Sequence, residues 1–268
     1  MSAGGESCLL CGASMRASFT ATVLGRHEVR YWSCPACGHF RTEKPYWLEQ
    51  AYSRAIAGAD TGLVMRNLGI ARQLACVLHE FFDHAGTYLD TAGGTGLLTR
   101  LMRDVGFDFR WEDPYCENVL AHGFDAAPGG AGYEAVTAFE AIEHMQDPLG
   151  FVRGCLERSR TRTLIFSTEL FEGAEPPRDW WYFAFPTGQH ISFFSRRTLE
   201  QLAARLGVTF LSHAGLHALT SRDIAPRAWR KVLDQVGRRH EKVAKKMQSL
   251  TLADHEAMLR RATAGGAG

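Results

Sequence analysis

Three glycines crowd into four positions of residues 88–97 (YLDTAGGTGL), directly behind an apolar run that ends in an acid. Glycine weakens helices and strands, so such a cluster marks a turn that needs positive φ or a backbone that a ligand approaches closely. The residues before it have the pattern of a buried strand, and those after it, up to Gly106, that of a helix. The turn therefore joins a strand end to a helix N-terminus, where a parallel sheet presents backbone amides to a nucleotide-like ligand.

The same alternation of strand and helix continues along the chain. We expect further strands within residues 107–114, 133–144 and 162–170, helices over 117–124, 147–159 and 195–207, and a closing hairpin over 208–221. Strands that alternate with helices predict a parallel sheet covered on both faces, which is a doubly wound, Rossmann-like α/β fold.

Composition limits the kinds of partner. The chain has 268 residues, of which 46% are hydrophobic, enough for one sizeable core and a small appendage. Its net charge of +1 is too small to attract nucleic acid or anionic lipid to the protein as a whole. Neither a signal peptide nor an apolar run of about 20 residues is visible. We therefore expect a cytoplasmic protein without a membrane span; the oligomeric state stays open.

Four of the seven cysteines form two tight pairs with the spacing C-x2-C-x22-C-x2-C. A glycine follows the second cysteine of each pair, at Gly12 and Gly38, and such turns direct backbone amides toward thiolates. Four thiolates at this spacing favour a structural, tetrahedral Zn²⁺ site over a disulfide framework. The predicted metal ligands are Cys8, Cys11, Cys34 and Cys37.

We divide the chain into a zinc-binding ribbon (1–45), a helical connecting or lid segment (46–85), a nucleotide-binding α/β domain (86–225) and a helical basic tail (226–268).

A second acid belongs about 20 residues beyond the glycine turn, at the end of the next strand, to bind ribose hydroxyls. Residues 110–115 (RWEDPY) supply it as Glu112 and Asp113. The spacing D-x-x-x-G-x-G at the turn differs from the G-x-G-x-x-G of NAD-dependent oxidoreductases, so that class is disfavoured.

The segments YLDTAGGTG, WEDP and AVTAFEAIEHMQDPLGFV, in this order, resemble successive motifs of class I S-adenosylmethionine (SAM)-dependent methyltransferases over residues 86–220. The resemblance implies that Asp90 orders the glycine loop and that Asp113 holds the ribose. The cofactor-binding set that it implies is Asp90, Ala92, Gly93, Gly94, Gly96, Asp113, Pro114, Phe139 and Glu140. The family usually has glycine where this chain has Ala92, so we expect that methyl group to tighten the turn.

Two histidines are candidates for a base that frees the methyl acceptor. His144 lies in EAIEHM and His190 in QHISFFS. A zinc-binding C-x2-C/C-x2-C module before a SAM domain, together with QHISFFS, resembles the bacterial deoxysugar C-methyltransferases, which act on nucleotide-linked keto-sugars. That resemblance implies His190 as the base, with His144 and Glu140 near the reacting centre. Gln189 and Thr187 depart from its pattern, so both C-methylation and O-methylation stay open, as does a structural role for either histidine.

The aromatic run within residues 180–185 lies between a strand and a helix, at the ligand end of an open α/β sheet. Aromatic rings there either pack into the core or form a wall for sugar rings or nucleobases. The substrate-binding candidates are Trp180, Trp181, Tyr182 and Gln189.

The sequence thus predicts a SAM-dependent methyltransferase acting on a small activated metabolite, best a nucleotide-linked sugar. One alternative is an RNA methyltransferase. Only the basic tail supports it, because residues 1–50 are nearly neutral and phosphate contacts require an excess of basic residues. Another is a SAM-binding protein that transfers no methyl group.

Overall fold

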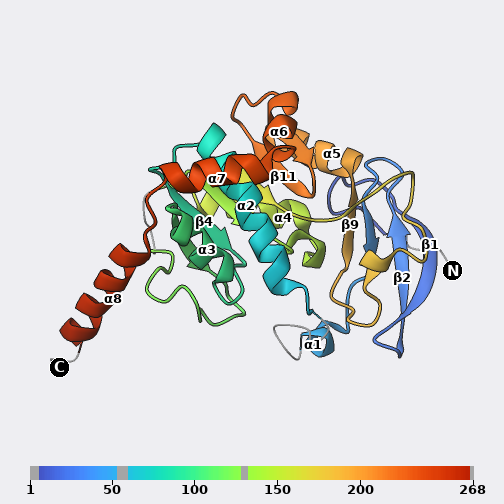
Figure 1. Cartoon of the computed structure of the whole chain (residues 1–268). Coiled ribbons are helices and arrows are strands. Elements are labelled where there is room, and N and C mark those ends of the chain that lie inside the picture. Colours follow the sequence, from blue (N-terminus) through green and yellow to red (C-terminus); the bar gives the residue numbers. More distant parts are fainter. Residues whose placement is uncertain (1–5, 53–59, 128–131, 266–268) are drawn as a thin grey trace.

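The computed structural model describes residues 6–52, 60–127 and 132–265 and contains two sheets (Figure 1). The larger sheet has the order β10-β11-β7-β6-β4-β5, in which β4 to β7 are parallel and the β10–β11 hairpin is antiparallel. Its strands are β4 (Thr87–Thr91), β5 (Asp108–Glu112), β6 (Ala135–Ala138), β7 (Thr163–Phe166), β10 (Thr209–His213) and β11 (Leu216–Thr220). The predicted α/β fold class and the closing hairpin are confirmed.

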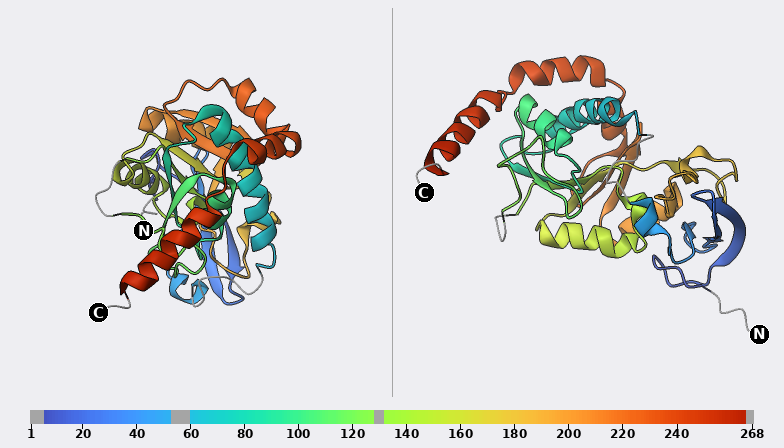
Figure 2. Two further views of the ribbon diagram at one scale, coloured as in Figure 1. Left: turned by 60° about the vertical axis from the view of Figure 1, so that its left-hand side comes forward. Right: turned by 90° about the horizontal axis from the view of Figure 1, so that it is seen from below.

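Helices cover both faces of this sheet (Figure 2). One face packs against α2 (Leu63–Phe81), α3 (Leu97–Val105), α6 (Pro226–Leu233) and α7 (Val236–Lys246), and the other against α4 (Pro148–Arg158) and α5 (Arg196–Leu206). A hydrophobic core lies on each face of the sheet. Because successive side chains of a strand point to opposite faces, Tyr88 packs into the core beneath α2 and α3, and Leu89 into the core beneath α4 and α5. Local signals begin these helices: Asp147 caps α4, and Ser195 forms a capping box with Thr198 at α5.

The second sheet has the order β1-β2-β3-β9-β8. It combines β1 (Arg16–Val23), β2 (His27–Ser33) and β3 (Phe40–Thr42) with β8 (Leu170–Phe171) and β9 (Ser192–Ser195). Strand β9 pairs antiparallel with β3, so that Phe40 lies opposite Phe193 and Arg41 opposite Ser192. The hairpin that β1 and β2 form around Gly25 is therefore extended by strands from a much later part of the chain.

A third hydrophobic cluster fills the space beside the second sheet. Phe40, Tyr182, Phe183 and Phe193 are all almost fully buried in it. The short helices α1 (Leu48–Ala51) and η2 (Trp181–Phe183) pack against this core, with Trp47 donating its indole hydrogen to the Gly188 carbonyl at 2.8 Å. Most of the aromatic run that the sequence places in a loop is thus core.

One expected helix is wrong. Residues 117–124 form bends and turns because the side chain of Asn118 replaces helical hydrogen bonds: its oxygen accepts the amide of Ala121, and its nitrogen donates to the Ala121 carbonyl, both at 2.9 Å. The helical tail is confirmed, although it consists of three helices. The last, α8 (Thr251–Gly265), projects away from the body in Figures 1 and 2.

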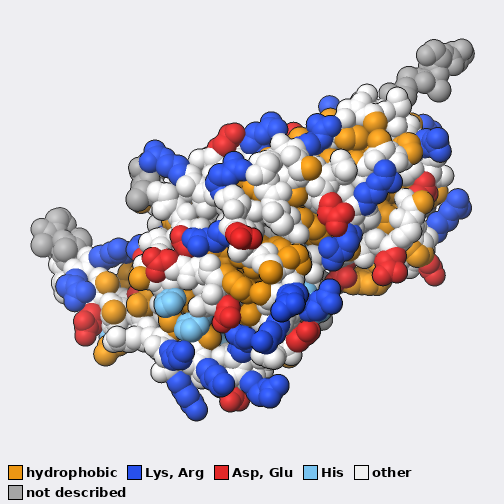
Figure 3. All heavy atoms as spheres, turned by 90° about the horizontal axis from the view of Figure 1, so that it is seen from above, with side chains coloured by type: hydrophobic (Ala, Val, Ile, Leu, Met, Phe, Trp, Pro, Cys, Tyr) orange, Lys and Arg blue, Asp and Glu red, His pale blue; other side chains and the backbone are white. Residues whose placement is uncertain are grey.

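The tail is anchored by a buried ion pair, since Arg103 of α3 donates to Asp254 of α8 at 2.7 and 2.9 Å. On the face that α6 and α7 form, Lys and Arg side chains are spread among acidic and apolar ones (Figure 3). No helix within the described part of the chain combines the length and apolar character that a membrane crossing requires.

Candidate active site

The glycine turn lies where β4 ends and α3 begins, as the sequence predicts. Its glycines have different neighbours. A Cβ on Gly93 would lie 2.7 Å from Cδ1 of Trp111, and one on Gly96 would lie 2.8 Å from Oδ1 of Asn118. A Cβ on Gly94 would meet nothing within 4 Å, and this residue has φ +54°. Gly93 and Gly96 are therefore required by internal packing, whereas the backbone at Gly94 is open to a ligand.

Ala92 has φ 54°, in the left-handed region that glycine enters without strain. The expected tightening of the turn thus takes the form of a strained backbone at the residue that precedes the glycines. Glu140, just beyond the end of the neighbouring strand β6, has φ 50° and is strained in the same way. Backbone strain gathers at the carboxyl ends of both central strands, which is common at ligand sites.

Asp90 is 2% exposed and contacts protein groups. Its two carboxylate oxygens accept the hydroxyls of Thr137 at 2.8 Å and Thr99 at 3.2 Å. Burial raises the pKa of Asp90 to about 7, while the two hydroxyls act in the opposite direction. The residue thus ties β4 to β6 and α3 from below the turn.

Asp113 is half-buried beside Gly94. One of its oxygens accepts the Gly94 amide at 2.9 Å, and the other accepts the amides of Tyr115 and Cys116 at 2.7 and 3.0 Å. A carboxylate has about four acceptor positions, so one is left for a further donor such as a ribose hydroxyl. The open backbone at Gly94 and this carboxylate fit the predicted cofactor. Pro114 is exposed beside them.

Glu140 and Phe139 lie half-buried at the end of β6, on the same edge of the sheet. The Glu140 carboxylate accepts the Ser167 hydroxyl at 2.6 Å and lies 3.6 Å from Nε of Arg66. Arg66 also pairs with Asp60. An arginine from α2 therefore reaches over this edge of the sheet.

The two histidines lie together, with ring centroids 5.0 Å apart and rings nearly perpendicular. Nδ1 of His190 lies 2.7 Å from the Tyr182 carbonyl, which can only accept, so this nitrogen carries the hydrogen and Nε2 carries the lone pair. Burial lowers the pKa of His190 to about 4, and the neighbouring His144 contributes in the same direction. A neutral imidazole with a free Nε2 has the protonation state of a general base.

One ring nitrogen of His144 lies close to two oxygen atoms. Its Nδ1 lies 3.0 Å from the Gln189 carbonyl and 2.9 Å from the Tyr52 hydroxyl, and burial lowers its pKa. Gln189 donates its side-chain amide to the Ala51 carbonyl at 3.0 Å. Tyr52 follows α1, so the connecting segment reaches the histidine pair; residues 53–59 lie outside the described residues.

The other substrate candidates differ in exposure. Trp181 is 71% exposed, Trp180 is half-buried, and Tyr182 is 2% exposed with its hydroxyl donated to Glu143 at 2.7 Å. Tyr182 is thus a buried residue that packs against His190. The sequence alone did not single out Glu143, a fully buried acid that directly precedes His144.

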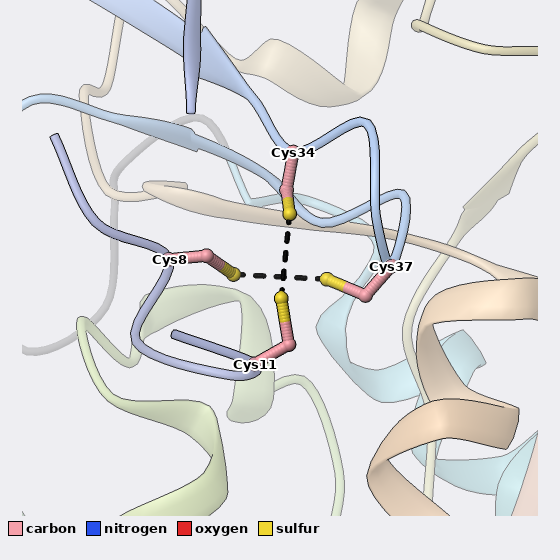
Figure 4. A group of neighbouring side chains, drawn as sticks. All are labelled: Cys8, Cys11, Cys34 and Cys37. Carbon is pink, nitrogen blue, oxygen red and sulfur yellow. Dashed lines mark hydrogen bonds between the residues drawn. The ribbon is translucent and has the colours of Figure 1, made fainter. Parts of the chain in front are cut away.

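The four predicted metal ligands converge on one point, with their sulfurs directed toward a common centre (Figure 4). All four Sγ atoms lie within 4.8 Å of one another; Cys8 is 3.6 Å from Cys37, and Cys11 is 3.4 Å from Cys34. Four sulfurs around a zinc ion with bonds of about 2.3 Å would stand about 3.8 Å apart. Gly12 and Gly38 have φ 78° and 79°, as the predicted turns require. The donor set and geometry fit zinc.

The sequence model of a family described as a methyltransferase domain matches residues 66–213. No curated protein matches the chain.

Several solved structures are similar in fold. The TnmH structure is 15% identical over 67% of this chain and 62% of that one, with a TM-score of 0.48. An O-methyltransferase family 2 protein from Planctomyces limnophilus, in complex with apigenin, is 14% identical over 64% and 63%, with a TM-score of 0.44. The neocarzinostatin-biosynthesis O-methyltransferase NcsB1, in complex with SAM and a naphthoic acid, is 17% identical over 65% and 60%, with a TM-score of 0.43. The chain spans less than two thirds of the length of each.

Proposed function

The chain belongs to the family of methyltransferase domains, and from this membership we propose that it transfers a methyl group from SAM to a small activated metabolite. The substrate class we propose is a nucleotide-linked sugar, in line with the zinc module and the QHISFFS segment. The reaction would take place in the cytoplasm.

In this proposal SAM binds at the edge of the sheet where β4, β5 and β6 end. Asp113 accepts a ribose hydroxyl, the open backbone at Gly94 lies against the cofactor, and Asp90 holds the turn from beneath. Phe139 and Glu140, from the neighbouring strand end, border the methionine side. The clear space at Gly94, beside a carboxylate with one acceptor position left, supports this placement.

His190 acts as the base that takes a proton from the acceptor at Nε2. The observation that carries this role is the 2.7 Å contact between Nδ1 and the Tyr182 carbonyl, which fixes the hydrogen on Nδ1 and leaves Nε2 free. His144 and Glu140 lie near the same centre, and Trp180, Trp181 and Gln189 border the acceptor. The four cysteines hold a structural zinc ion, which stabilises the sheet that contains β9.

The test uses a nucleoside-diphosphate keto-sugar and SAM labelled in its methyl group. We expect label in the sugar with the wild-type protein, and a loss of about 10²–10⁴-fold with His190→Ala, the usual contribution of a general base. The SAM Kd of the variant should stay within about threefold.

The same probe separates the two kinds of transfer. Methylation at carbon requires removal of the hydrogen next to the carbonyl, so the protein should exchange that hydrogen for deuterium in heavy water without SAM. Methylation at oxygen requires no such exchange. Normal transfer by His190→Ala would contradict the base role, and absence of label in every sugar probe would contradict the substrate class.

A further inference from the structure

Glu143 is a carboxyl group with no exposed surface. It lies in the short helix η1 (Ile142–His144), directly after β6. One oxygen accepts the Tyr182 hydroxyl at 2.7 Å, whereas its other oxygen, Oε2, has no hydrogen-bond partner among the described residues. Burial of a carboxyl group with so little compensation costs stability, so its presence calls for an explanation outside packing.

Glu143 holds the segment around His190 at two points. Its side chain fixes the Tyr182 hydroxyl, and its main-chain carbonyl accepts the amide of Ile191, the next residue after His190, at 2.9 Å. Tyr182 in turn touches His190 twice: its carbonyl lies 2.7 Å from Nδ1, and its ring centroid lies 4.4 Å from that of the imidazole. A continuous set of contacts therefore leads from Glu143 through Tyr182 to the imidazole.

We propose that Glu143 is a positioning residue for His190, which acts through Tyr182 to hold the imidazole with its hydrogen on Nδ1 and its lone pair on Nε2. The inference rests on the proposed function, in which His190 is the base. The Tyr182 hydroxyl also lies 3.2 Å from the Thr168 hydroxyl, but the contact with Glu143 is the shorter one, so its loss would loosen the Tyr182 ring and with it both contacts to His190. Such supporting contacts fix the tautomer and orientation of functional histidines.

The role requires the shape of Glu143 and not its charge. Burial, with the nearby Glu140, raises the pKa of Glu143 to about 8, so the group is neutral at pH 7. A glutamine has the same shape and keeps an oxygen that accepts the Tyr182 hydroxyl. Glu143→Gln should therefore preserve the position of His190, while Glu143→Leu, which fills the space without an acceptor, should not.

The test is the ¹⁵N NMR spectrum of the His190 ring in the full-length protein, which reports the tautomer without SAM or acceptor. We expect one tautomer, with hydrogen on Nδ1, in the wild type and in Glu143→Gln. Glu143→Leu and Tyr182→Phe should show a mixture of tautomers. Thr163→Val is the matched control, since it removes a buried 2.7 Å hydrogen bond to Thr220 elsewhere in the sheet; it should leave the His190 spectrum unchanged.

Kinetics with the labelled-SAM and keto-sugar assay complete the test. Glu143→Leu should lower kcat about 100-fold, the scale of a misplaced catalytic group, with the KM for SAM unchanged. Glu143→Gln should stay within about threefold of the wild type. Because the spectrum needs no substrate, it judges the positioning role even if the keto-sugar is not the acceptor.

Two results would overturn the proposal. One is an unchanged His190 tautomer in both Glu143→Leu and Tyr182→Phe. The other is a second metal ion per chain that is lost in Glu143→Gln. Ligand atoms of Glu143, His144 and His190 lie within 4.8 Å of one another, and such an ion would make them metal ligands.

Discussion

Nε2 of His39 lies 2.8 Å from the Ser192 hydroxyl, and this hydrogen bond joins the cysteine cluster to the strand that follows His190. On the other side of the same ring, Nδ1 of His39 lies 3.8 Å from Sγ of Cys8. His39 and Ser192 are fully buried, and strands β3 and β9 pair beside them. The cysteine cluster and the proposed base therefore lie beside paired strands of one sheet, whereas Asp90 and Asp113 lie at strand ends of the other.

This arrangement predicts that loss of the proposed zinc ion affects transfer more than cofactor binding. Cys34→Ser, or removal of the metal by a chelator, should lower methyl transfer about tenfold or more, because β9 would no longer be held in place. The SAM Kd, measured by calorimetry, should change less than about threefold. Cys155→Ser, a buried cysteine outside the cluster, is the matched control. Equal losses of SAM affinity and transfer would contradict the separation of roles.

Asp113, the acid directly after β5, should decide SAM affinity. Asp113→Ala should weaken SAM binding about 10–100-fold, the value of a hydrogen bond to a charged group. Its neighbour Glu112 bonds to Thr91 at 3.2 Å and lies 3.8 Å from Arg158, so Glu112→Gln should bind SAM normally. Calorimetric titration distinguishes the two. If Glu112→Gln lost affinity and Asp113→Ala kept it, the ribose would be assigned to the wrong acid.

The strained turn predicts a stabilising substitution. Ala92→Gly removes a left-handed penalty of about 1–2 kcal/mol and adds a chain-entropy cost of about 0.5–1 kcal/mol. The free energy of unfolding should therefore rise by about 0.5–1 kcal/mol, measured by urea denaturation.

The control for this substitution is Ala214→Gly, at another alanine with positive φ (51°) in the β10–β11 hairpin. It should also be stabilising. Only the change at Ala92 should alter SAM affinity, since Ala214 lies in the hairpin, away from the turn. A lower unfolding free energy for Ala92→Gly would show that the methyl group contributes more through packing than it costs in strain.

Asp90 should make stability depend on pH. Its pKa is about 7 in the folded protein and about 3.8 in the unfolded chain, so the folded state binds the extra proton between these values. Its contribution is present below pH 3.8 and is lost as pH rises toward 7, by about 1.4 kcal/mol for each pH unit in that window. Asp90→Asn should remove this decline, and the difference in unfolding free energy between variant and wild type should grow from pH 5 to pH 7 and level off above that pH. A difference that is constant with pH would contradict the raised pKa.

The rate of transfer should depend little on pH in the mildly acidic range. His190 has a pKa of about 4, so its base form persists as pH falls from 8 to 5.5. An ordinary histidine would lose half of its base form near pH 6.5. Measured kcat values should therefore stay within about twofold over this range, and a midpoint near 6.5 would assign the proton transfer to a more exposed group.

Local patterns predicted much of this molecule. The strand–glycine–helix unit at Asp90, the acid at Asp113 and the cysteine spacing each depend on neighbours within a few dozen residues, and these features lie where the sequence placed them. The pairing of Phe40 with Phe193 could not be predicted in this way, because the register between distant strands leaves no local signal. Glu143 could not be singled out for a related reason, because the sequence shows neither its burial nor its contact with Tyr182.

The most direct test of the proposed function is transfer of labelled methyl from SAM into an extract of the source cells, fractionated by size, with and without ribonuclease. We predict label in the low-mass fraction, insensitive to ribonuclease and lost with His190→Ala while SAM is still bound. Label confined to a ribonuclease-sensitive heavy fraction would contradict this prediction. It would favour an RNA methyltransferase in which the basic residues of the tail bind the RNA. Absence of label in every fraction, with SAM bound in calorimetry, would also contradict the prediction and favour a protein that binds SAM without transferring its methyl group.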